Sequence, residues 1–229
     1  MPSRRSTKTS RRNSLDGSTV LRALRDTLGR AQLPSVSEIA GRHPEPFRIL
    51  VSTLISLRTQ DRVTTAASNR LFARAATPEE MARLSAGEIA ELIYPAGFYN
   101  TKARNIGSIA RTLTERYRGK VPTNRDELLK LPGVGRKTAN LVLGLGFGTP
   151  AICVDTHVHR IANRLGLVST RTPEQTEWGL EEEFPRDEWT SINELFVRFG
   201  QRICTPVSPW CSRCPLFEGC PRVGVERSR

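Results

Sequence analysis

The chain has 229 residues, with 35 Lys and Arg against 23 Asp and Glu, and therefore a formal net charge of +12 at pH 7. Its hydrophobic fraction of 38% is ordinary for a globular protein, and no apolar run approaches the roughly 20 residues of a membrane helix. Composition excludes membrane, fibrous and wholly disordered proteins, and the basic charge favours a polyanionic partner, nucleic acid first.

The N-terminal segment is basic and polar. Residues 1–16 contain five Lys or Arg side chains and one carboxylate, Asp16, and we expect a disordered basic tail over residues 1–17. The apolar run of a secretory signal is missing, which predicts the cytoplasm, at the nucleoid; targeting by the tail to an organelle or nucleus is the alternative. In a reducing compartment the five cysteines should be thiols or metal ligands, not disulfides.

Helix-start signals recur along the chain, and sustained period-two alternation does not occur. We therefore predict an all-α fold. N-cap residues followed three positions later by an acid or amide occur at Thr77 with Glu80, Ser85 with Glu88, Thr123 with Asp126, and Thr172 with Gln175. Residues 47–57 and 139–147 are apolar nearly all round and should form central helices, whereas residues 18–29, 103–118 and 176–184 should form outer ones.

The segment LPGVGRKTAN at 131–140 predicts a helix, a tight hairpin and a second helix. Gly133 and Gly135 flank Val134, so the backbone can take positive φ while Val134 anchors the turn in the core. The glycine N–H groups, at the positive end of the second helix, would form a nest for one backbone phosphate. An ordinary αα-turn with glycine is the alternative.

Lys137 lies in the first turn of that second helix, beside Arg136. The neighbouring charge and the helix dipole both disfavour its ammonium form. A neutral amine is what nucleophilic attack at a sugar carbon requires. A surface lysine that contacts phosphate is the alternative.

Asp155 follows the apolar run 151–154 and precedes a predicted helix over residues 156–165. We expect it to cap that helix, a role that leaves its carboxylate ionised and free for catalysis. His157 and His159 are alternative catalytic groups, although a histidine in a polar helical turn is more often a surface residue.

Four cysteines near the C-terminal end follow the pattern C-x6-C-x2-C-x5-C, at Cys204, Cys211, Cys214 and Cys220. Four thiolates in a proline-rich segment can converge on one metal centre. Zinc is one candidate, but zinc ribbons usually have two C-x2-C knuckles; a [4Fe–4S] cluster is wider and suits the longer spacings. Cys153 lies outside the set and should be an inert core residue.

The hairpin at 131–140, VDTHVHRIANRL at 154–165, IYPAGFYNTKA at 93–103 and the cysteine pattern together resemble the endonuclease III family of helix-hairpin-helix DNA glycosylases. The resemblance implies an all-α fold of two lobes with the active-site cleft between them. One lobe would be a six-helix barrel over residues 39–149; the other, a discontinuous iron–sulfur domain, would comprise residues 18–38 and 150–229.

The resemblance also implies an activity, that of a bifunctional DNA glycosylase and AP lyase. Such an enzyme removes oxidised pyrimidines from duplex DNA in base excision repair. Lys137 matches the family's Schiff-base nucleophile and Asp155 its catalytic carboxylate, and the four cysteines would bind a [4Fe–4S] cluster. We expect a monomer acting on double-stranded DNA with damaged bases or abasic sites, and no membrane partner.

The DNA-contacting residues implied by the resemblance come from several segments: Ser56, Arg58 and Asp61 at the lesion pocket, Phe98 and Asn100 in a wedge loop, Gly133, Val134, Gly135 and Arg136 at the hairpin, and His157. Arg58 departs from the family pattern, which has Gln there, and this leaves the opposite-base preference and lesion range open.

Two other functions fit part of the pattern. An adenine-specific glycosylase of the same superfamily would need a Glu within residues 50–61, where this chain has none, and would lack the lysine nucleophile. A non-catalytic DNA-binding module would need neither Lys137 nor Asp155. Both residues therefore favour the glycosylase and lyase.

Overall fold

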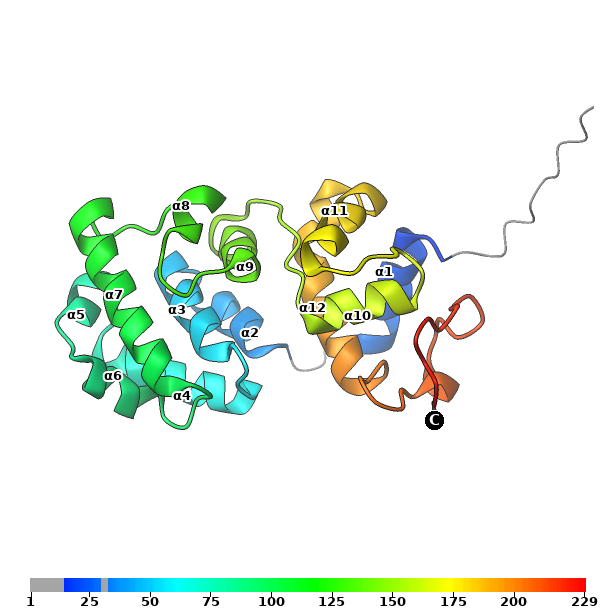
Figure 1. Cartoon of the computed structure of the whole chain (residues 1–229), viewed down its shortest axis with the longest axis horizontal. Helices are drawn as coiled ribbons and strands as arrows, with labels where there is room; N and C mark the ends of the chain where they lie inside the picture. Colours follow the sequence, from blue (N-terminus) through cyan, green and yellow to red (C-terminus); the bar gives the residue numbers. More distant parts are fainter. Residues whose placement is uncertain (1–14, 30–32) are drawn as a thin grey trace, which may run out of the picture.

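The computed structural model describes residues 15–29 and 33–229, and in these ranges it is helical with no strand. The predicted all-α fold is confirmed. Two lobes lie side by side (Figure 1). Their helices are α1 (Gly17–Leu28), α2 (Ser35–Arg42), α3 (Pro46–Ser56), α4 (Asp61–Arg74), α5 (Pro78–Ala82), α6 (Ala86–Ile93), α7 (Tyr99–Tyr117), α8 (Arg125–Leu129), α9 (Arg136–Phe147), α10 (Thr156–Arg164), α11 (Pro173–Glu183) and α12 (Trp189–Arg202).

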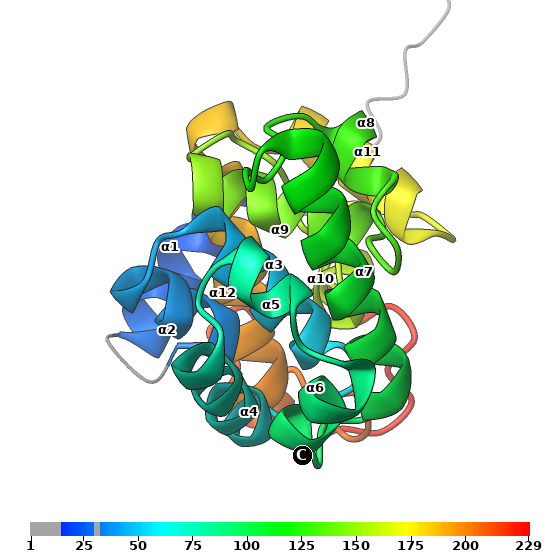
Figure 2. The ribbon, with the colours of Figure 1, turned by 90° about the vertical axis from the view of Figure 1, so that its left-hand side faces the viewer.

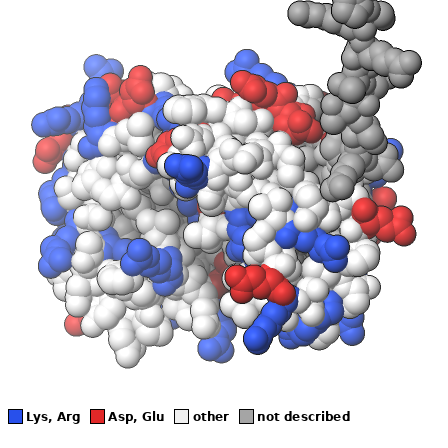
Figure 3. All heavy atoms as spheres, turned by 45° about the vertical axis from the view of Figure 1, so that its right-hand side comes forward, with Lys and Arg blue, Asp and Glu red and all other residues white. Residues whose placement is uncertain are grey.

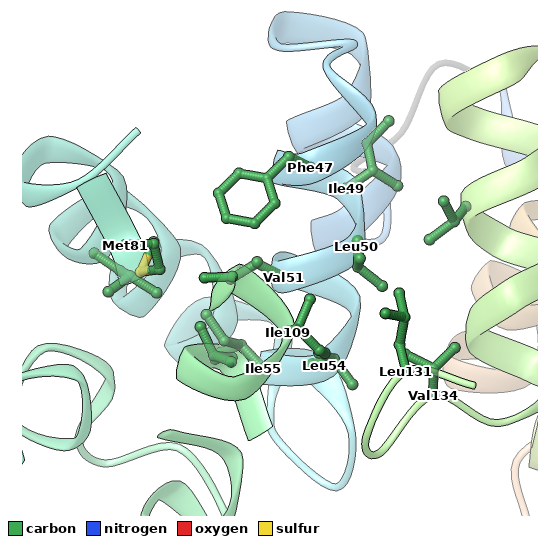
Figure 4. Close-up of a cluster of buried hydrophobic side chains, with 14 of the residues drawn as sticks. Phe47, Ile49, Leu50, Val51, Leu54, Ile55, Met81, Ile109, Leu131 and Val134 are labelled. Carbon is green, nitrogen blue, oxygen red and sulfur yellow. The ribbon is translucent and has the colours of Figure 1, made fainter. Parts of the chain in front are cut away.

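The first lobe, α2 to α9, is built around α3. This helix packs against α2, α4, α7 and α9, and nearly all of its side chains are buried, as its apolar sequence predicts. Seen from the outer end of the lobe, α5, α6 and α7 lie toward the viewer, with α12 of the second lobe behind (Figure 2). Val134 of the hairpin joins this core, and Figure 4 shows it with Leu131 on the side facing α3.

The second lobe combines the two ends of the described chain. Helix α1 packs against α12, which also packs against α10, and together with α11 they enclose a separate apolar core. Three of the four C-terminal cysteines, Cys204, Cys214 and Cys220, pack against this core, and Cys211 is buried nearby. None of the helices in the described residues is long and apolar enough to cross a membrane.

Three of the four predicted helix starts are confirmed. Thr77 and Ser85 form reciprocal capping boxes with Glu80 and Glu88, and the Thr172 side chain accepts from Gln175 N. The fourth, at Thr123, is wrong. The cap is the next residue, Asn124, whose side chain accepts from Glu127 N. Asn is at least as good an N-cap as Thr.

The boundaries of the two lobes differ in places from those expected. Residues 1–14 of the expected tail lie outside the described residues, but Asp16 caps α1, whose first residue is Gly17. We placed residues 18–38 with the second lobe, yet Val36 of α2 packs into the first core. That assignment is wrong for α2, because its buried side chains face α3 and α4.

Candidate active site and cysteine centre

Lys137 and Asp155 meet between the lobes. Lys137 lies in the first turn of α9 in the first lobe, and Asp155 directly precedes α10 in the second. Lys137 Nζ is 3.6 Å from Asp155 Oδ2, with 37% of the lysine side chain and 12% of the aspartate side chain exposed. An amine that reaches solvent beside a shielded carboxylate can both attack a substrate and pass on a proton.

The two carboxylate oxygens of Asp155 have different partners. Oδ1 accepts from the backbone N–H groups of His157 and Val158, both at 2.9 Å, which confirms the predicted cap of α10. Oδ2 faces Lys137. The cap fixes the rotation of the side chain, so the oxygen that remains is aimed at the amine.

A cleft of about 680 Å³ opens beside this pair. Both lobes line it, with Ser56, Leu57, Arg58, Phe98, Thr101, Lys102, Asn105 and Lys137 from the first and Val154, Asp155, Thr156, His159 and Pro173 from the second. Lys and Arg side chains are spread over both lobes on the face that Figure 3 shows, rather than gathered in one patch. This distribution suits a long polyanion that touches both lobes.

The hairpin has the predicted glycine turn, with one difference. Gly133 has φ of 77°, and a Cβ there would overlap Asn105 Nδ2. Both the backbone conformation and the lack of space therefore disfavour a side chain at this position. Gly135 has φ of −96° and space around it; our expectation of positive φ is wrong there because Gly135 is the extended N-cap of α9.

Val134 has its side chain in the core and its N–H bonded to Leu131 O, so it offers nothing to a phosphate. The N–H groups of Gly133 and Gly135, by contrast, donate to no acceptor in the described part of the chain. Both N–H groups therefore remain available as hydrogen-bond donors at the start of α9.

Arg136 is held by a buried carboxylate. Its Nε and Nη2 donate to the two oxygens of Glu177 in α11, at 2.7 and 3.0 Å, and Arg125 also approaches that carboxylate at 3.5 Å. Glu177 is 2% exposed. Arg136 therefore joins the hairpin to the second lobe, and its guanidinium is already occupied by protein.

Arg58 and Phe98 lie at the mouth of the cleft. The Phe98 ring is 63% exposed, which excludes a core role, and the Arg58 guanidinium lies 5.5 Å from its centre. Both residues have positive φ, 51° and 57°. Asn100 is exposed in the first turn of α7 and does not line the cleft.

Ser56, Asp61 and His157 line a second hollow of about 240 Å³, which Lys137 and Asp155 also line. Ser56 also lines the main cleft. Asp61 accepts from Ser35 and from Gln201, so it joins α2 and α4 to α12. Burial lowers the pKa of His157, which keeps this ring neutral near pH 7.

Lys102, which lines the main cleft, was not predicted as a site residue. Lys102 is 7% exposed and donates three hydrogen bonds, one to α3 and two to the loop after it. Its place on the apolar stripe of α7 with Ile106 and Leu113 was a signal for it. His159, which we weighed as a catalytic alternative, bonds through Nδ1 to Thr176 Oγ1 at 2.6 Å.

The four C-terminal cysteines line one small cavity together with Arg164, Arg222 and apolar side chains that include Phe199, Ile203 and Trp210. In the described residues no three His, Cys, Asp or Glu side chains are placed to hold a single metal ion. Burial raises the pKa of Cys214 to about 11 and raises that of Cys220, so thiolates there would need a positive centre to stabilise them. Cys153 is buried away from this set, as predicted.

Comparisons with known proteins identify the family. The family described as "HhH-GPD superfamily base excision DNA repair protein" matches residues 51–186. Endonuclease III of Thermotoga maritima is 52% identical over 176 residues, which cover 77% of this chain and 83% of that protein. Endonuclease III homolog 1, chloroplastic, of Arabidopsis thaliana is 44% identical over 80% of this chain, which spans 50% of that longer protein.

A solved structure shows the same fold. It is an endonuclease III trapped as a covalent intermediate with DNA, with a TM-score of 0.81 and 35% identity, covering 91% of this chain and 97% of that one. Because it covers 91% of this chain, the match extends through both lobes. The chain belongs to the endonuclease III family within the HhH-GPD superfamily.

Proposed function

We propose that this protein is a bifunctional DNA glycosylase and AP lyase that removes oxidised pyrimidines from duplex DNA in base excision repair. The observation that carries the proposal is the pairing of the Lys137 amine with Asp155 Oδ2 at the edge of a cleft between two lobes. A binding module would need no such pair. Family membership and the likeness to endonuclease III bound to DNA support duplex DNA as the partner.

The chemistry begins with a damaged nucleotide turned out of the duplex into the cleft, which costs a few kcal/mol and favours weakened pairs. Lys137 Nζ forms a bond to the sugar C1′ as the bond from C1′ to the base breaks. The base leaves with the bonding electrons, and Asp155 Oδ2 accepts the proton that the attacking nitrogen loses. The negative carboxylate also stabilises the positive charge that develops on the sugar.

The lyase step follows from the covalent bond. Opening of the sugar ring gives a Schiff base between Lys137 and C1′, and loss of a proton from C2′ then expels the 3′ phosphate. The strand is cut 3′ to the lesion, and water releases the lysine. Asp155, held by its N-cap hydrogen bonds and 12% exposed, is placed to exchange protons in these steps without leaving its position.

Residues at the mouth of the cleft support the proposal for base extrusion. The exposed Phe98 ring can enter the base stack, and Arg58, stacked near it, can fill the gap and donate hydrogen bonds there. The free N–H groups of Gly133 and Gly135 would hold one backbone phosphate. Arg136, occupied by Glu177, supports the hairpin instead of reading DNA.

Cys204, Cys211, Cys214 and Cys220 would hold a [4Fe–4S] cluster. The donor set is four thiols that line one cavity, and the C-x6-C and C-x5-C spacings between them suit a centre wider than one zinc ion. Bound there, the cluster would stabilise the segment after α12 and its loops. This role is structural and lies apart from Lys137. We place the protein in the cytoplasm at the nucleoid.

Covalent trapping tests the proposal. Borohydride should trap wild-type protein on duplex DNA that carries thymine glycol or an abasic site, because it reduces the Schiff base to a stable amine. Lys137→Gln should trap at least ~10³-fold less, the scale of losing a nucleophile. Lys120→Gln, at an exposed lysine, is the matched control and should trap normally. Equal trapping by Lys137→Gln would overturn the assignment.

A further inference from the structure

Lys102 is a buried cation with three oxygen partners and no carboxylate. It projects from the first turn of α7, and its Nζ donates to Ile55 O at 2.7 Å, Leu57 O at 2.5 Å and Thr59 Oγ1 at 2.9 Å. Those oxygens lie at the C-terminal end of α3 and in the loop after it. A positive charge is stabilised there by the helix dipole and by carbonyls at the helix end, of which Leu57 O also accepts from Thr59 Oγ1 at 3.3 Å.

An ammonium group supplies three donors, so the three oxygen partners suit the charged form of Lys102. Burial opposes that form and lowers the pKa of Lys102 to about 8. A buried lysine is costly to keep, and methionine would fill the same volume without that cost. The arrangement stabilises one particular shape of the loop at the price of some global stability.

Thr59 links two loops at the cleft: the first loop, residues 57–60 after α3, and the second loop, residues 94–98 before α7. Its Oγ1 accepts from Lys102 and also from Gly97 N, at 3.1 Å. Gly97 packs closely on the first loop, since a Cβ there would lie 2.5 Å from Arg58 O. Lys102 is therefore joined through one hydroxyl to the residue that precedes Phe98.

The two loops present the exposed side chains at the mouth of the cleft. Arg58 and Phe98 both have positive φ, a conformation that is unfavourable for non-glycine residues and persists only where the surroundings enforce it. The contacts that enforce it are those of Lys102, Thr59 and Gly97. The guanidinium and the ring then stack 5.5 Å apart as one unit.

We infer that Lys102 is a positioning residue that couples Arg58 to Phe98, so that the two side chains act together on the strand opposite the lesion. The inference rests on the proposed function. In the described residues the hydrogen bonds of Lys102 Nζ go to Ile55 O, Leu57 O and Thr59 Oγ1, and none goes to Lys137 or Asp155, so Lys102 acts through the loop that carries Arg58. Its contribution should therefore appear where the duplex must be opened and the opposite base read, and not where the base is already absent.

The experiment compares two reactions of the full-length protein under single-turnover conditions. The first is excision of thymine glycol placed opposite each of the four bases, and the second is strand cleavage at a preformed abasic site. Lys102→Met should lower excision roughly 10- to 100-fold, the scale of a misplaced contact, and should weaken its dependence on the opposite base. Cleavage at the abasic site should change by less than about threefold.

A double-mutant cycle tests the coupling. In a background that carries Arg58→Ala and Phe98→Ala, Lys102→Met should cost less than about twofold, because the side chains it positions are gone. Thr59→Val removes only the bridging hydroxyl and should show the same excision defect. It replaces Lys102→Met in the test if that variant does not fold. Lys120→Met, at an exposed lysine, is the control and should behave as wild type.

Equal losses in both reactions, or the same loss in both backgrounds, would overturn the inference and assign Lys102 a purely structural role. Failure of the proposed function looks different. In that case wild-type protein neither excises thymine glycol nor cleaves the abasic site.

Discussion

Lys137 and Asp155 come from different lobes, yet Lys137 Nζ lies 3.6 Å from Asp155 Oδ2. The lysine begins α9 of the first lobe, and the aspartate begins α10 of the second. Neither lobe alone contains the pair. The separation of the two atoms is therefore set by the packing of one lobe on the other, and the site depends on contacts distant from it.

Asp155→Asn should separate catalysis from helix capping. Asn caps helices as well as Asp, so the free energy of unfolding should change by less than about 1 kcal/mol. The excision rate should fall about 10²-fold or more, because the amide cannot accept the proton from Lys137. Single-turnover kinetics and denaturant unfolding measure the two effects.

Asp16→Asn is the matched control for Asp155→Asn, since Asp16 caps α1 in the same way and does not line the cleft. It should leave both stability and excision near wild type. Loss of stability in Asp155→Asn comparable to its loss of activity would contradict a catalytic role for the carboxylate.

The cysteine set should bind iron and sulfide. The purified protein should be brown, with broad absorption at roughly 400 nm from thiolate-to-iron charge transfer. Cys214→Ser should lose the colour and the iron, whereas Cys153→Ser, at a buried cysteine outside the set, should keep both. Metal analysis and absorption spectra check this. A colourless protein with stoichiometric zinc would refute the cluster.

Arg136→Gln should affect stability more than DNA binding. The substitution leaves Glu177, 2% exposed, with only Arg125 at 3.5 Å, and should lower the free energy of unfolding by about 3 kcal/mol. Adding Glu177→Gln should recover part of the loss, because the buried charge is then gone. Unchanged stability with a salt slope of DNA binding reduced by about 1 would instead make Arg136 a phosphate contact.

Lys102 should make stability depend on pH above neutrality. Burial lowers its pKa from 10.5 to about 8, so between these values the unfolded chain binds more protons than the folded one. Its contribution to the free energy of unfolding therefore rises with pH in that window, and its burial cost is complete below pH 8.

The difference between wild type and Lys102→Met isolates this term, because other titrating groups cancel. From pH 7 to 9.5 the wild type should gain about 1–2 kcal/mol relative to the variant. Urea unfolding at the two pH values measures it. A constant difference, or one that falls with pH, would contradict the shift.

Local signals predicted much of the fold and the reacting pair. Capping at Thr77, Ser85 and Asp155 involves neighbours within a few residues, and the apolar character of residues 47–57 sufficed to make α3 central. The error at Thr123 came from two adjacent cap residues of similar quality, Thr123 and Asn124. Hydrogen-bond geometry, which sequence spacing does not contain, decides between them.

Long-range pairing was beyond these signals. Glu177 lies 41 residues from Arg136, and Lys102 lies 43 residues from Thr59. A positively charged residue beside a glycine hairpin, such as Arg136, suggests phosphate binding as long as its carboxylate partner is unknown. Only the packing of α11 on the hairpin reveals that the guanidinium is already neutralised.

The segment that crosses between the lobes is bonded to both. Asn140 of α9 donates to Ile152 O, and Asn193 of α12 donates to the next carbonyl, Cys153 O. Both amides are buried, so this passage has little freedom to act as a hinge. These bonds resist a change in the spacing of the lobes, so the double helix is the partner that must deform. Duplexes that kink easily, as at a damaged pair, fit the cleft at the lowest elastic cost. The flexibility of the duplex is then part of what the protein recognises.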